Sequence, residues 1–426
     1  MKDIRVSLGE RSYAITVADS YARLPERLRH LGLGRHGWVV SHRSVLARSG
    51  RDLLGPLRRA GWTVETLVVP ESETSKSFAH AQRLITQLSR RAAMRIPVLF
   101  AFGGGVVGDL AGFVAAVYRR GVPYVQLPTT LLAQVDSAIG GKVGVDLPHA
   151  KNLVGSFHQP RLVWNNLSLL RTLPLRQRRS GLAEVIKYGA IADPTLFRFL
   201  ETHLRECLRL ELRAVRVMVE RSCAIKAAVV SRDERETRGL RAQLNFGHTL
   251  GHALEAAGGY RRWTHGEAIA IGMCAAARLS AALGKLAERD CERVVRLIRA
   301  AGLPTESRGV SRNAVRAALR YDKKFIHGRA RWVLLARLGQ VTVTEAVPPS
   351  AAERVISVFL RYRGTRRIVW RPSSWRSVTE PLAICSIVAS PTRSPTATIS
   401  PLITAYGSPS PSTTPLSTRP GLSAPA

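Results

Sequence analysis

Residues 103–109 read GGGVVGD and stand between an apolar run (IPVLFAF, 96–102) and a helical pattern (LAGFVAAVY, 110–118). Glycines let a backbone approach a phosphate closely, and a helix N-terminus offers free N–H groups and the positive end of a dipole. The spacing fits G-x-G-x-x-G, but such turns are often only structural, so the motif depends on its strand-to-helix context. In that context the stretch favours a dinucleotide pyrophosphate bound at the carboxyl end of a sheet strand.

Strand and helix signals alternate on both sides of this motif through about residue 180. Residues 4–17 read as a hairpin. Short apolar runs with β-branched content lie at 37–41, 63–70, 96–102 and 122–128. Alternation of this kind predicts a doubly wound, mostly parallel sheet. We therefore expect an α/β N-terminal domain over residues 1–180.

The sequence pattern changes after this region. Long segments carry apolar residues at helical spacing, and strand signals return only at RWVLLARLGQVTV (331–343). These patterns predict a mainly α-helical second domain over residues 181–360. Residues 361–426 are rich in Ser, Thr, Pro and Arg without periodicity, which predicts a disordered tail because such a segment buries too little apolar surface to fold alone.

The composition excludes several classes of protein. The chain has 426 residues and a formal net charge of +34. No apolar run approaches the roughly 20 residues that cross a bilayer, and the N-terminus lacks the apolar segment of a secretory signal. Five scattered cysteines indicate neither a disulfide framework nor a zinc ribbon, so a cytoplasmic location is expected.

The basic charge is dispersed along the chain. Arginines spread from end to end, and no helix-turn-helix or ribonucleoprotein pattern occurs. Specific binding of nucleic acid is therefore not expected. A basic field of this kind would instead attract a small phosphorylated acid.

Lysine is rare in this chain, since nine of its 64 Lys and Arg residues are lysines. A lysine retained against this background is a candidate for chemistry that a planar guanidinium cannot replace. The block 118–160 sets isolated charges among glycines, and any one of these charges alone would more often be a solvated surface residue. Together they indicate a loop system that closes around an anionic ligand, formed by Arg120, Asp136, Lys142, Lys151 and Asn152.

Three motifs of the second domain carry metal-type ligands. GLAEVIKYG places Glu184 and Lys187 three residues apart on one helix face. LNFGHTLGHALE places His248 and His252 four residues apart, and WTHGEAIAIG adds His265. Two imidazoles and one carboxylate give the coordination of catalytic zinc, with a position open for substrate. A histidine pair at this spacing also occurs on plain helix surfaces, so the spacing alone leaves both interpretations open.

Several segments, taken in order, resemble the motifs of 3-dehydroquinate synthases. They are PTTLLAQVDSAIGGKVGVD (128–146), AKNLVGSFHQP (150–160), TLPLRQRRSGLAEVIKYG (172–189), LNFGHTLGHALE (244–255) and HGEAIAIGM (265–273), supported by ETSKS (73–77) and YDKK (321–324). The resemblance extends to about residue 360, and the agreement of independent segments makes it specific. One departure is DERETRGLR (233–241), which is one residue longer than the family pattern DExExGLR.

The resemblance implies an NAD-binding domain, a metal-binding domain and a site in the cleft between them. It implies that Glu184, His248 and His265 hold one zinc or cobalt ion. The residues implied to contact NAD are Glu73, Lys76, Gly104, Gly105, Asp109, Thr129, Thr130, Lys142, Lys151, Thr172 and Leu173. The implied catalytic residues are Arg120, Asp136, Lys142, Asn152, Lys187 and His252. The implied substrate-binding residues are Lys151, Lys226, Arg241, Asn245, Lys323 and Lys324, and the sequence does not tell which of the last two points inward.

The implied reaction converts 3-deoxy-D-arabino-heptulosonate 7-phosphate to 3-dehydroquinate and phosphate. NAD oxidises the C5 hydroxyl, the new ketone acidifies the C6 proton so that phosphate leaves by β-elimination, and NADH returns the hydride before ring opening and aldol closure. A metal ion chelating the C4 and C5 oxygens would lower the alcohol pKa and polarise the ketone. The resemblance also implies a homodimer.

Three alternatives remain open at the level of the sequence. The first is a sister sugar phosphate cyclase of the epi-valiolone or scyllo-inosose type. The second is a polyol dehydrogenase of the iron-dependent type, which would not need so many lysines. The third is a non-catalytic basic protein on the same scaffold, against which the intact ligand motifs count.

Overall fold

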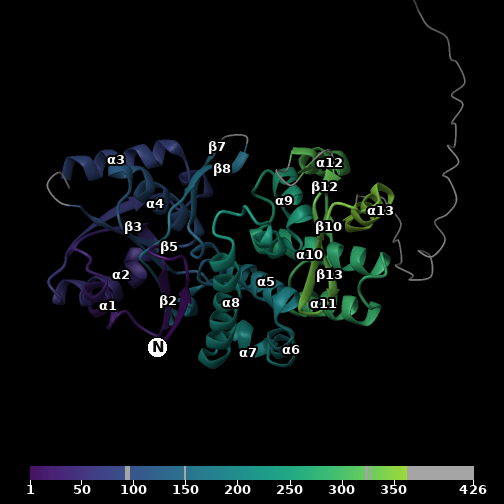
Figure 1. Ribbon diagram of the computed structural model, residues 1–426, viewed down its shortest axis with the longest axis horizontal. Helices are drawn as coiled ribbons and strands as arrows, with labels where there is room; N and C mark the ends of the chain where they lie inside the picture. The colour runs from purple at the N-terminus through teal and green to yellow at the C-terminus, as the bar shows by residue number, and fades with distance from the viewer. Residues whose placement is uncertain (92–95, 148–149, 322–324, 327–328, 362–426) are drawn as a thin grey trace, which may run out of the picture. The chain divides into compact units, whose positions relative to one another are not determined.

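The computed structural model describes residues 1–91, 96–147, 150–321, 325–326 and 329–361, which belong to one compact unit (Figure 1). Lys323, Lys324 and the predicted tail from residue 362 onward lie outside the described residues. Within them, no helix combines the length and the apolar character that crossing a bilayer requires. The division into domains at residue 180 stays a prediction.

A seven-stranded sheet forms the N-terminal part, in the order β1–β2–β9–β6–β5–β3–β4. β1 and β2 pair antiparallel, and the other neighbours in this sheet pair parallel, which confirms the predicted fold class. The strand β9, which the sequence analysis did not anticipate, joins the hairpin to the parallel strands. The strands of this sheet are β1 (Lys2–Val6), β2 (Tyr13–Ala18), β3 (His36–His42), β4 (Thr63–Val69), β5 (Val98–Gly103), β6 (Tyr124–Pro128) and β9 (Leu162–Asn166).

Helices cover both faces of this sheet (Figure 1). Trp38 and Val40 of β3 pack with α3 (Phe78–Arg91) and α4 (Gly105–Val117), while Val39 between them packs with the helices on the opposite face. Those helices are α1 (Leu24–His30) and α2 (Arg43–Arg59). Because successive strand residues point to opposite faces, burial on both sides explains why the strands read as continuous apolar runs.

Part of the glycine-rich block forms a hairpin, not only the predicted loop system. β7 (Lys142–Leu147) pairs antiparallel with β8 (Ala150–Phe157). Val143 and Val145 alternate with smaller or polar residues and are buried in the core that includes α4. The glycines hide this strand periodicity, and they allow a close approach because a Cβ at Gly155 would overlap the carbonyl oxygen of Val143.

The second half of the chain is mainly helical, as the sequence predicts, and its core is one large cluster that also includes Ile15 and Val17 of β2. The segment LAEVIKYGAIADPTLFRFLE divides into two helices, because Asp193 caps the second through the Leu196 N–H at 2.9 Å and Pro194 occupies its first position. The helices are α5 (Leu175–Ala192), α6 (Pro194–Thr202), α7 (Leu204–Arg209), α8 (Leu212–Arg232), α9 (His248–Ala257), α10 (His265–Ala282), α11 (Glu288–Ala300), α12 (Arg312–Tyr321) and α13 (Pro349–Phe359).

Short two-stranded sheets complete the described part of this half. The expected strand signal at 331–343 is confirmed as an antiparallel hairpin of β13 and β14. The strands are β10 (Ser307–Arg308), β11 (Phe325–Ile326), β12 (Arg329–Ala330), β13 (Trp332–Arg337), β14 (Gln340–Thr344) and β15 (Leu360–Arg361).

Candidate functional site

The three predicted metal ligands lie together although they come from three helices. One donor atom from each of Glu184 (α5), His248 (α9) and His265 (α10) lies within 4.8 Å of the others. Nε2 of His265 lies 3.2 Å from Oε1 of Glu184, and Nε2 of His248 lies 3.6 Å from the same oxygen. Glu184 is fully buried. Two imidazole nitrogens and a carboxylate oxygen that face one point are a donor set suited to a divalent metal.

Two glycines allow the three ligand-bearing helices to approach. A Cβ at Gly266, directly after His265, would overlap the backbone of Ser180 in α5. A Cβ at Gly272 would overlap the carbonyl oxygen of Gly247, directly before His248. Only residues without a side chain fit such contacts, so the distances between the ligands are fixed by touching backbones.

The two histidine ligands differ in their second nitrogen. Nδ1 of His248 lies 3.3 Å from the carbonyl oxygen of Phe246, whereas Nδ1 of His265 lies 3.3 Å from Oε2 of Glu255. Burial lowers the pKa of His265, but the carboxylates of Glu255 and Glu184 outweigh it and raise that pKa to about 10. The carboxylates around His265 therefore favour a positive charge at this site, whether a proton or a metal ion carries it.

A second buried cluster surrounds Asp136. This residue lies in a π-helical turn (Ala133–Ser137), and its Oδ1 accepts from Lys226 Nζ at 2.6 Å and from the Tyr188 hydroxyl at 2.5 Å. Lys187 Nζ lies 4.0 Å from the same oxygen and also pairs with Glu184. This lysine therefore connects the Asp136 cluster to the metal-type ligands.

The charges of this cluster shift one another's pKa values. Burial raises the pKa of Asp136, but Lys226 and Lys187 outweigh it, and the net pKa lies well below the usual range. Burial lowers the pKa of Lys226 even though Asp136 opposes this. The cluster thus holds two ammonium groups beside one carboxylate in a place with little water.

The predicted dinucleotide turn has the expected geometry. β5 ends at Gly103, and α4 begins at Gly105 with Gly104 as its N-cap. The Thr129 N–H donates to the carbonyl oxygen of Gly103 at 2.9 Å, which fixes the turn to the end of β6. A Cβ at Gly104 would come within 3.2 Å of Thr130, so a side chain would crowd the surface that the free N–H groups of α4 face. The turn is therefore open to a phosphate group.

Predicted nucleotide and substrate residues form one charged network beside this turn. Lys76 Nζ donates to Asp109 Oδ2 at 2.6 Å and also to the amide oxygen of Asn152. Lys151 Nζ donates to Glu73 Oε1 at 2.7 Å and lies 4.5 Å from the ring centre of Tyr260. Burial raises the pKa of Asp109, although Lys76 opposes this.

Another group of charges lies at the segment that departs from the family pattern, residues 233–241. Here Lys142 and Arg241 both contact Glu236, which the sequence analysis did not single out. The Glu236 carboxylate pairs with Lys142, and its Oε1 lies 3.5 Å from Arg241 Nε. Glu236 adopts a φ of 61°, in the left-handed region. Burial and Arg241 lower the pKa of Lys142 more than Glu236 raises it. Glu236, which matches the second glutamate of the pattern DExExGLR, thus lies between Lys142, which the resemblance assigns to catalysis and NAD, and Arg241, which it assigns to the substrate.

Of the remaining predicted residues, some lie beside the metal motif and others do not. The ring centre of His252 lies 5.1 Å from that of His248, and Asn245 ends a short 3-10 helix (Leu240–Asn245) just before the metal motif. Thr172 ends another short 3-10 helix and Leu173 caps it. Arg120 is exposed and, within the described part of the chain, forms no hydrogen bond or ion pair with the other predicted residues.

The contacting residues that the sequence analysis did not single out include Tyr188, Glu236 and Glu255. Tyr188 is adjacent to Lys187, but a residue next to a predicted one on a helix normally faces elsewhere. Glu255 follows His252 by three residues and His248 by seven, which is a signal that could have found it. Glu236 lies in a loop where residue spacing does not predict direction.

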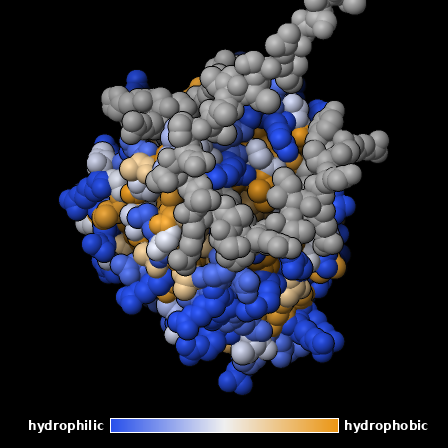
Figure 2. Space-filling view, turned by 90° about the vertical axis from the view of Figure 1, so that its right-hand side faces the viewer, coloured by the Kyte–Doolittle hydropathy of each residue, from blue (hydrophilic) through white to orange (hydrophobic). Residues whose placement is uncertain are grey.

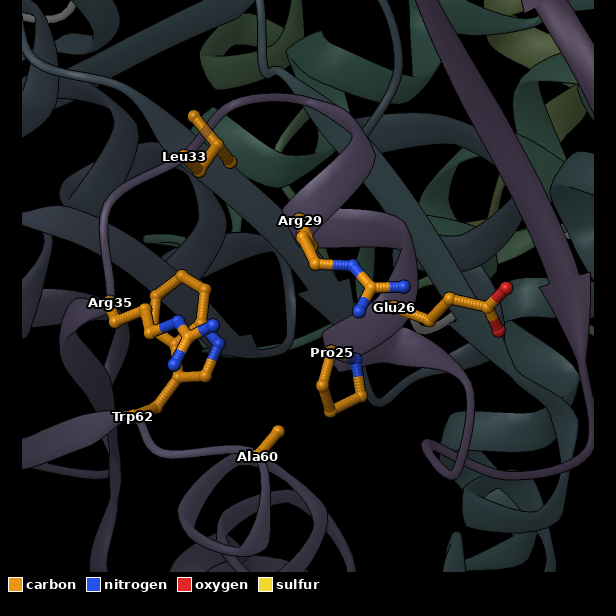
Figure 3. Close-up of a pocket in the computed structure, with 7 residues that line it drawn as sticks. All are labelled: Pro25, Glu26, Arg29, Leu33, Arg35, Ala60 and Trp62. Carbon is orange, nitrogen blue, oxygen red and sulfur yellow. The ribbon is translucent and has the colours of Figure 1, made fainter.

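A separate cavity of about 340 Å³ lies at the amino ends of β3 and β4 (Figure 3). Its lining residues are Pro25, Glu26, Arg29, Leu33, Arg35, Ala60 and Trp62. None of the predicted site residues contributes to it, and the candidate site follows the opposite, carboxyl ends of the strands. On the face drawn in Figure 2, hydrophilic residues are spread around the part of the surface that is coloured.

Two family profiles match consecutive parts of the chain. Residues 66–180 match 3-dehydroquinate synthase N-terminal, and residues 181–325 match 3-dehydroquinate synthase C-terminal. The chain belongs to the 3-dehydroquinate synthase family. A relative from Desulforamulus reducens, named 3-dehydroquinate synthase, is 44% identical over 359 residues, which cover 84% of this chain and 100% of the relative.

Solved structures share the fold. A 2-epi-5-epi-valiolone synthase from Streptomyces hygroscopicus subsp. jinggangensis, with NAD+ and Zn2+ bound, has a TM-score of 0.75 and 26% identity, covering 83% of this chain and 98% of that chain. A 2-deoxy-scyllo-inosose synthase, complexed with carbaglucose-6-phosphate, NAD+ and Co2+, has a TM-score of 0.73 and 24% identity, covering 83% and 99% of the two chains. The second likeness concerns the fold alone.

Proposed function

We propose that this protein is a 3-dehydroquinate synthase, which converts 3-deoxy-D-arabino-heptulosonate 7-phosphate to 3-dehydroquinate and phosphate. The observation that carries the proposal is the convergence of Glu184, His248 and His265 next to the buried Asp136 cluster. The full-length likeness to a relative of that name favours this activity over the sister cyclases, which match at lower identity.

Two cofactors fit the residues present. The donor set of Glu184, His248 and His265 suits zinc or cobalt, and such an ion supplies Lewis-acid polarisation of a bound alcohol or ketone. The turn at Gly104 and Gly105 with the N-terminus of α4 suits the pyrophosphate of NAD, which supplies the hydride chemistry. The dinucleotide contacts assigned to Glu73, Lys76, Asp109, Thr129, Thr130, Thr172 and Leu173 belong to the same proposal.

The side chains of this protein bind and orient the substrate. Lys142 and Arg241 are cations that both contact Glu236 and interact electrostatically with the Asp136 cluster, and they would bind the phosphate or carboxylate of the substrate in place of Glu236. Lys187 and Lys226, held by Asp136, keep positive charge beside the reacting hydroxyl groups. His252, Asn245, Lys151 and Asn152 would complete the pocket, together with Arg120, whose side chain is exposed.

Lowered pKa values suit two of these lysines to proton transfer. Burial lowers the pKa of Lys226 and of Lys142, which brings each closer to the pH at which a group both gives and takes a proton. Asp136 limits this effect at Lys226, and Glu236 limits it at Lys142. Displacement of Glu236 by substrate would therefore change the acidity of Lys142.

The proposal also includes the domain division, the oligomeric state and the cellular location. The division into an NAD-binding domain (1–180) and a metal-binding domain (181–360) would place the reaction in the cleft between them. A homodimer is implied by the family resemblance, and a cytoplasmic location is expected from the scattered cysteines. Size-exclusion chromatography with light scattering would test the homodimer directly.

Phosphate release from the heptulosonate 7-phosphate tests the function. We expect the purified protein to release phosphate and form 3-dehydroquinate only when both NAD and a divalent metal are present, with the activity lost after chelation and restored by zinc or cobalt. Release from sedoheptulose 7-phosphate but not from the heptulosonate would assign the protein to a sister cyclase. No release from any sugar phosphate by folded, metal-loaded protein would contradict the proposal.

A further inference from the structure

We infer that Glu255 is a positioning residue for the metal ligand His265 and that it sets the metal affinity of the site. The inference rests on the proposed function, since it assumes that His265 binds the metal through Nε2. Oε2 of Glu255 lies 3.3 Å from Nδ1 of His265, while Nε2 of the same ring lies 3.2 Å from Glu184. The imidazole thus stands between two carboxylates, one on each nitrogen.

The register of α9 directs Glu255 toward the site. His248, His252 and Glu255 follow one another at four and three residues, so they share one face of the helix. The side chain of Glu255 is 11% exposed, and its α9 backbone is fixed against α10 by the close approach at Gly272. A partly buried carboxylate on a rigid helix holds its partner in one orientation.

The contact with Glu255 determines the tautomer of His265. A carboxylate accepts hydrogen bonds but cannot donate one, so it holds a proton on Nδ1 and leaves Nε2, which faces Glu184, as the nitrogen that gives up its proton to bind a metal. The negative charge also makes Nε2 more basic and therefore a stronger ligand. His248 differs, because the group at its Nδ1 is the backbone carbonyl of Phe246, which carries no net charge. Of the two histidines, His265 is then the one whose ligand strength depends on a side chain.

A rival interpretation makes Glu255 a metal ligand itself. One donor atom from each of His252, Glu255 and His265 also lies within 4.8 Å of the others, which could suit a second cation. His265 would then have to bind one cation through each nitrogen and lose both ring protons. Because a neutral imidazole has only one free nitrogen, the structure favours one cation, with Glu255 as the acceptor at Nδ1.

Zinc affinity measured by competition with a chromophoric chelator tests this role. For Glu255→Gln and Glu255→Ala in the full chain, we expect zinc affinity to fall about 10- to 100-fold. Glu255→Asp should recover part of the loss, because it keeps the charge. The matched control is Glu267→Gln, since Glu267 lies in α10 two residues after His265 but pairs with Arg176 and the N-cap Thr264. This control should leave zinc affinity unchanged.

The cobalt-substituted protein gives a second measurement that a purely structural role would not change. The visible absorption of bound Co2+ should shift in Glu255→Gln, while the thermal midpoint of the metal-free variant stays near that of the wild type. Equal zinc affinity in wild type and Glu255→Gln would overturn the inference. Binding of two zinc ions by the wild type and one by Glu255→Gln would overturn it in favour of a ligand role.

The outcome is separable from the proposed function. A wild-type protein that binds one zinc ion but releases no phosphate would refute the synthase activity while the affinity comparison still decides the role of Glu255. A wild-type protein that catalyses the reaction, with unchanged zinc affinity in Glu255→Gln, would refute only the role of Glu255. A wild-type protein that binds neither zinc nor cobalt would refute both.

Discussion

The two halves of the candidate site hold their charges in different ways. In the helical half, Glu184, Lys187 and Lys226 lie on long helices with at most a few per cent of their surface exposed, and they pair with one another or with Asp136. In the sheet half, the turn at Gly104 offers backbone N–H groups, and the side chain of Lys142 is 50% exposed. The helical half is thus assembled from buried side chains, whereas the sheet half combines backbone groups with the buried Lys76 and the half-exposed Lys142.

This difference separates two tasks. Buried charges have already lost their water, so they act on a substrate without further reorganisation, but they destabilise the fold if a partner is lost. Solvated cations cost the fold little and can change partners when an anion arrives, as Lys142 would in leaving Glu236. The helical half therefore suits the chemical step, and the sheet half suits capture and release. Three substitutions test this contrast.

The largest effect is expected from Glu184→Gln, which removes the buried anionic metal ligand. A catalytic metal contributes several kcal/mol to transition-state stabilisation, so turnover should fall about 10²- to 10³-fold at limiting zinc. The measurement is kcat for phosphate release over a zinc titration. Glu292→Gln on α11 is the control, because Glu292 is 50% exposed and pairs only loosely with Arg296 at 3.7 Å. Equal turnover in the two variants would contradict the assigned ligand.

Asp136→Asn should give the largest loss of stability, because it leaves the buried ammonium group of Lys226 without its carboxylate and leaves Lys187 paired with Glu184 alone. We expect the free energy of unfolding to fall by about 3 kcal/mol, near the lower end for a broken buried pair, since the Asp136 side chain is 23% exposed. Urea denaturation of the metal-free protein measures it. Tyr188→Phe is the control, since it removes one neutral donor to the same oxygen and should cost only about 1 kcal/mol.

The stability of the wild type and of Asp136→Asn should depend on pH in different ways. The pKa of Asp136 is lowered in the folded state, so its contribution to stability is fully present above the unfolded value of about 4 and is lost as the pH falls below it. Between about pH 5 and pH 3 the wild type should therefore lose more stability than Asp136→Asn. Parallel losses in the two proteins would mean that Asp136 is not held as an anion by its lysines.

The smallest effect is expected at Glu236, a residue of the helical half whose carboxylate pairs with Lys142 of the sheet half. Its carboxylate raises the pKa of Lys142 against burial and Arg241, so Glu236→Gln should lower that pKa and increase the amine's reactivity. At pH 8 we expect Lys142 to be modified about two- to fivefold faster, the scale of a solvent-screened pair. Mass spectrometry of acetylated peptides measures the rate, with exposed Lys285 as the internal reference. An unchanged rate would mean that Glu236 does not influence Lys142.

The sequence predicted the helical half of the site better than the sheet half. His248 and His265 begin α9 and α10, and Glu184 stands three residues before Lys187 within α5. In a helix, the spacing of two residues along the sequence determines whether their side chains point in the same direction. The mainly parallel sheet was predicted from the alternation of strand and helix signals along the sequence. The hairpin of β7 and β8 was not predicted, because glycine removed the side chains that would have shown its period of two.

Partners that come from loops could not be predicted. Glu236 contacts Lys142 only because a φ of 61° turns its segment back toward β7, and the sequence contains no periodic signal for that turn. Tyr188 and Lys187 are neighbours in sequence, yet both contact Asp136, because Asp136 lies in a turn packed between α5 and α8. Only tertiary packing brings such groups together.

The close contacts at Gly266 and Gly272 have a consequence for how this protein tolerates change. Because the ligand-bearing helices touch through their backbones, the spacing of the donor atoms does not depend on which apolar side chains fill the surrounding core. Substitutions such as Ile271→Val, within α10, can then alter the melting temperature without altering the coordination geometry. Apolar residues of the helical core can therefore change while the donor atoms of the metal centre keep their positions.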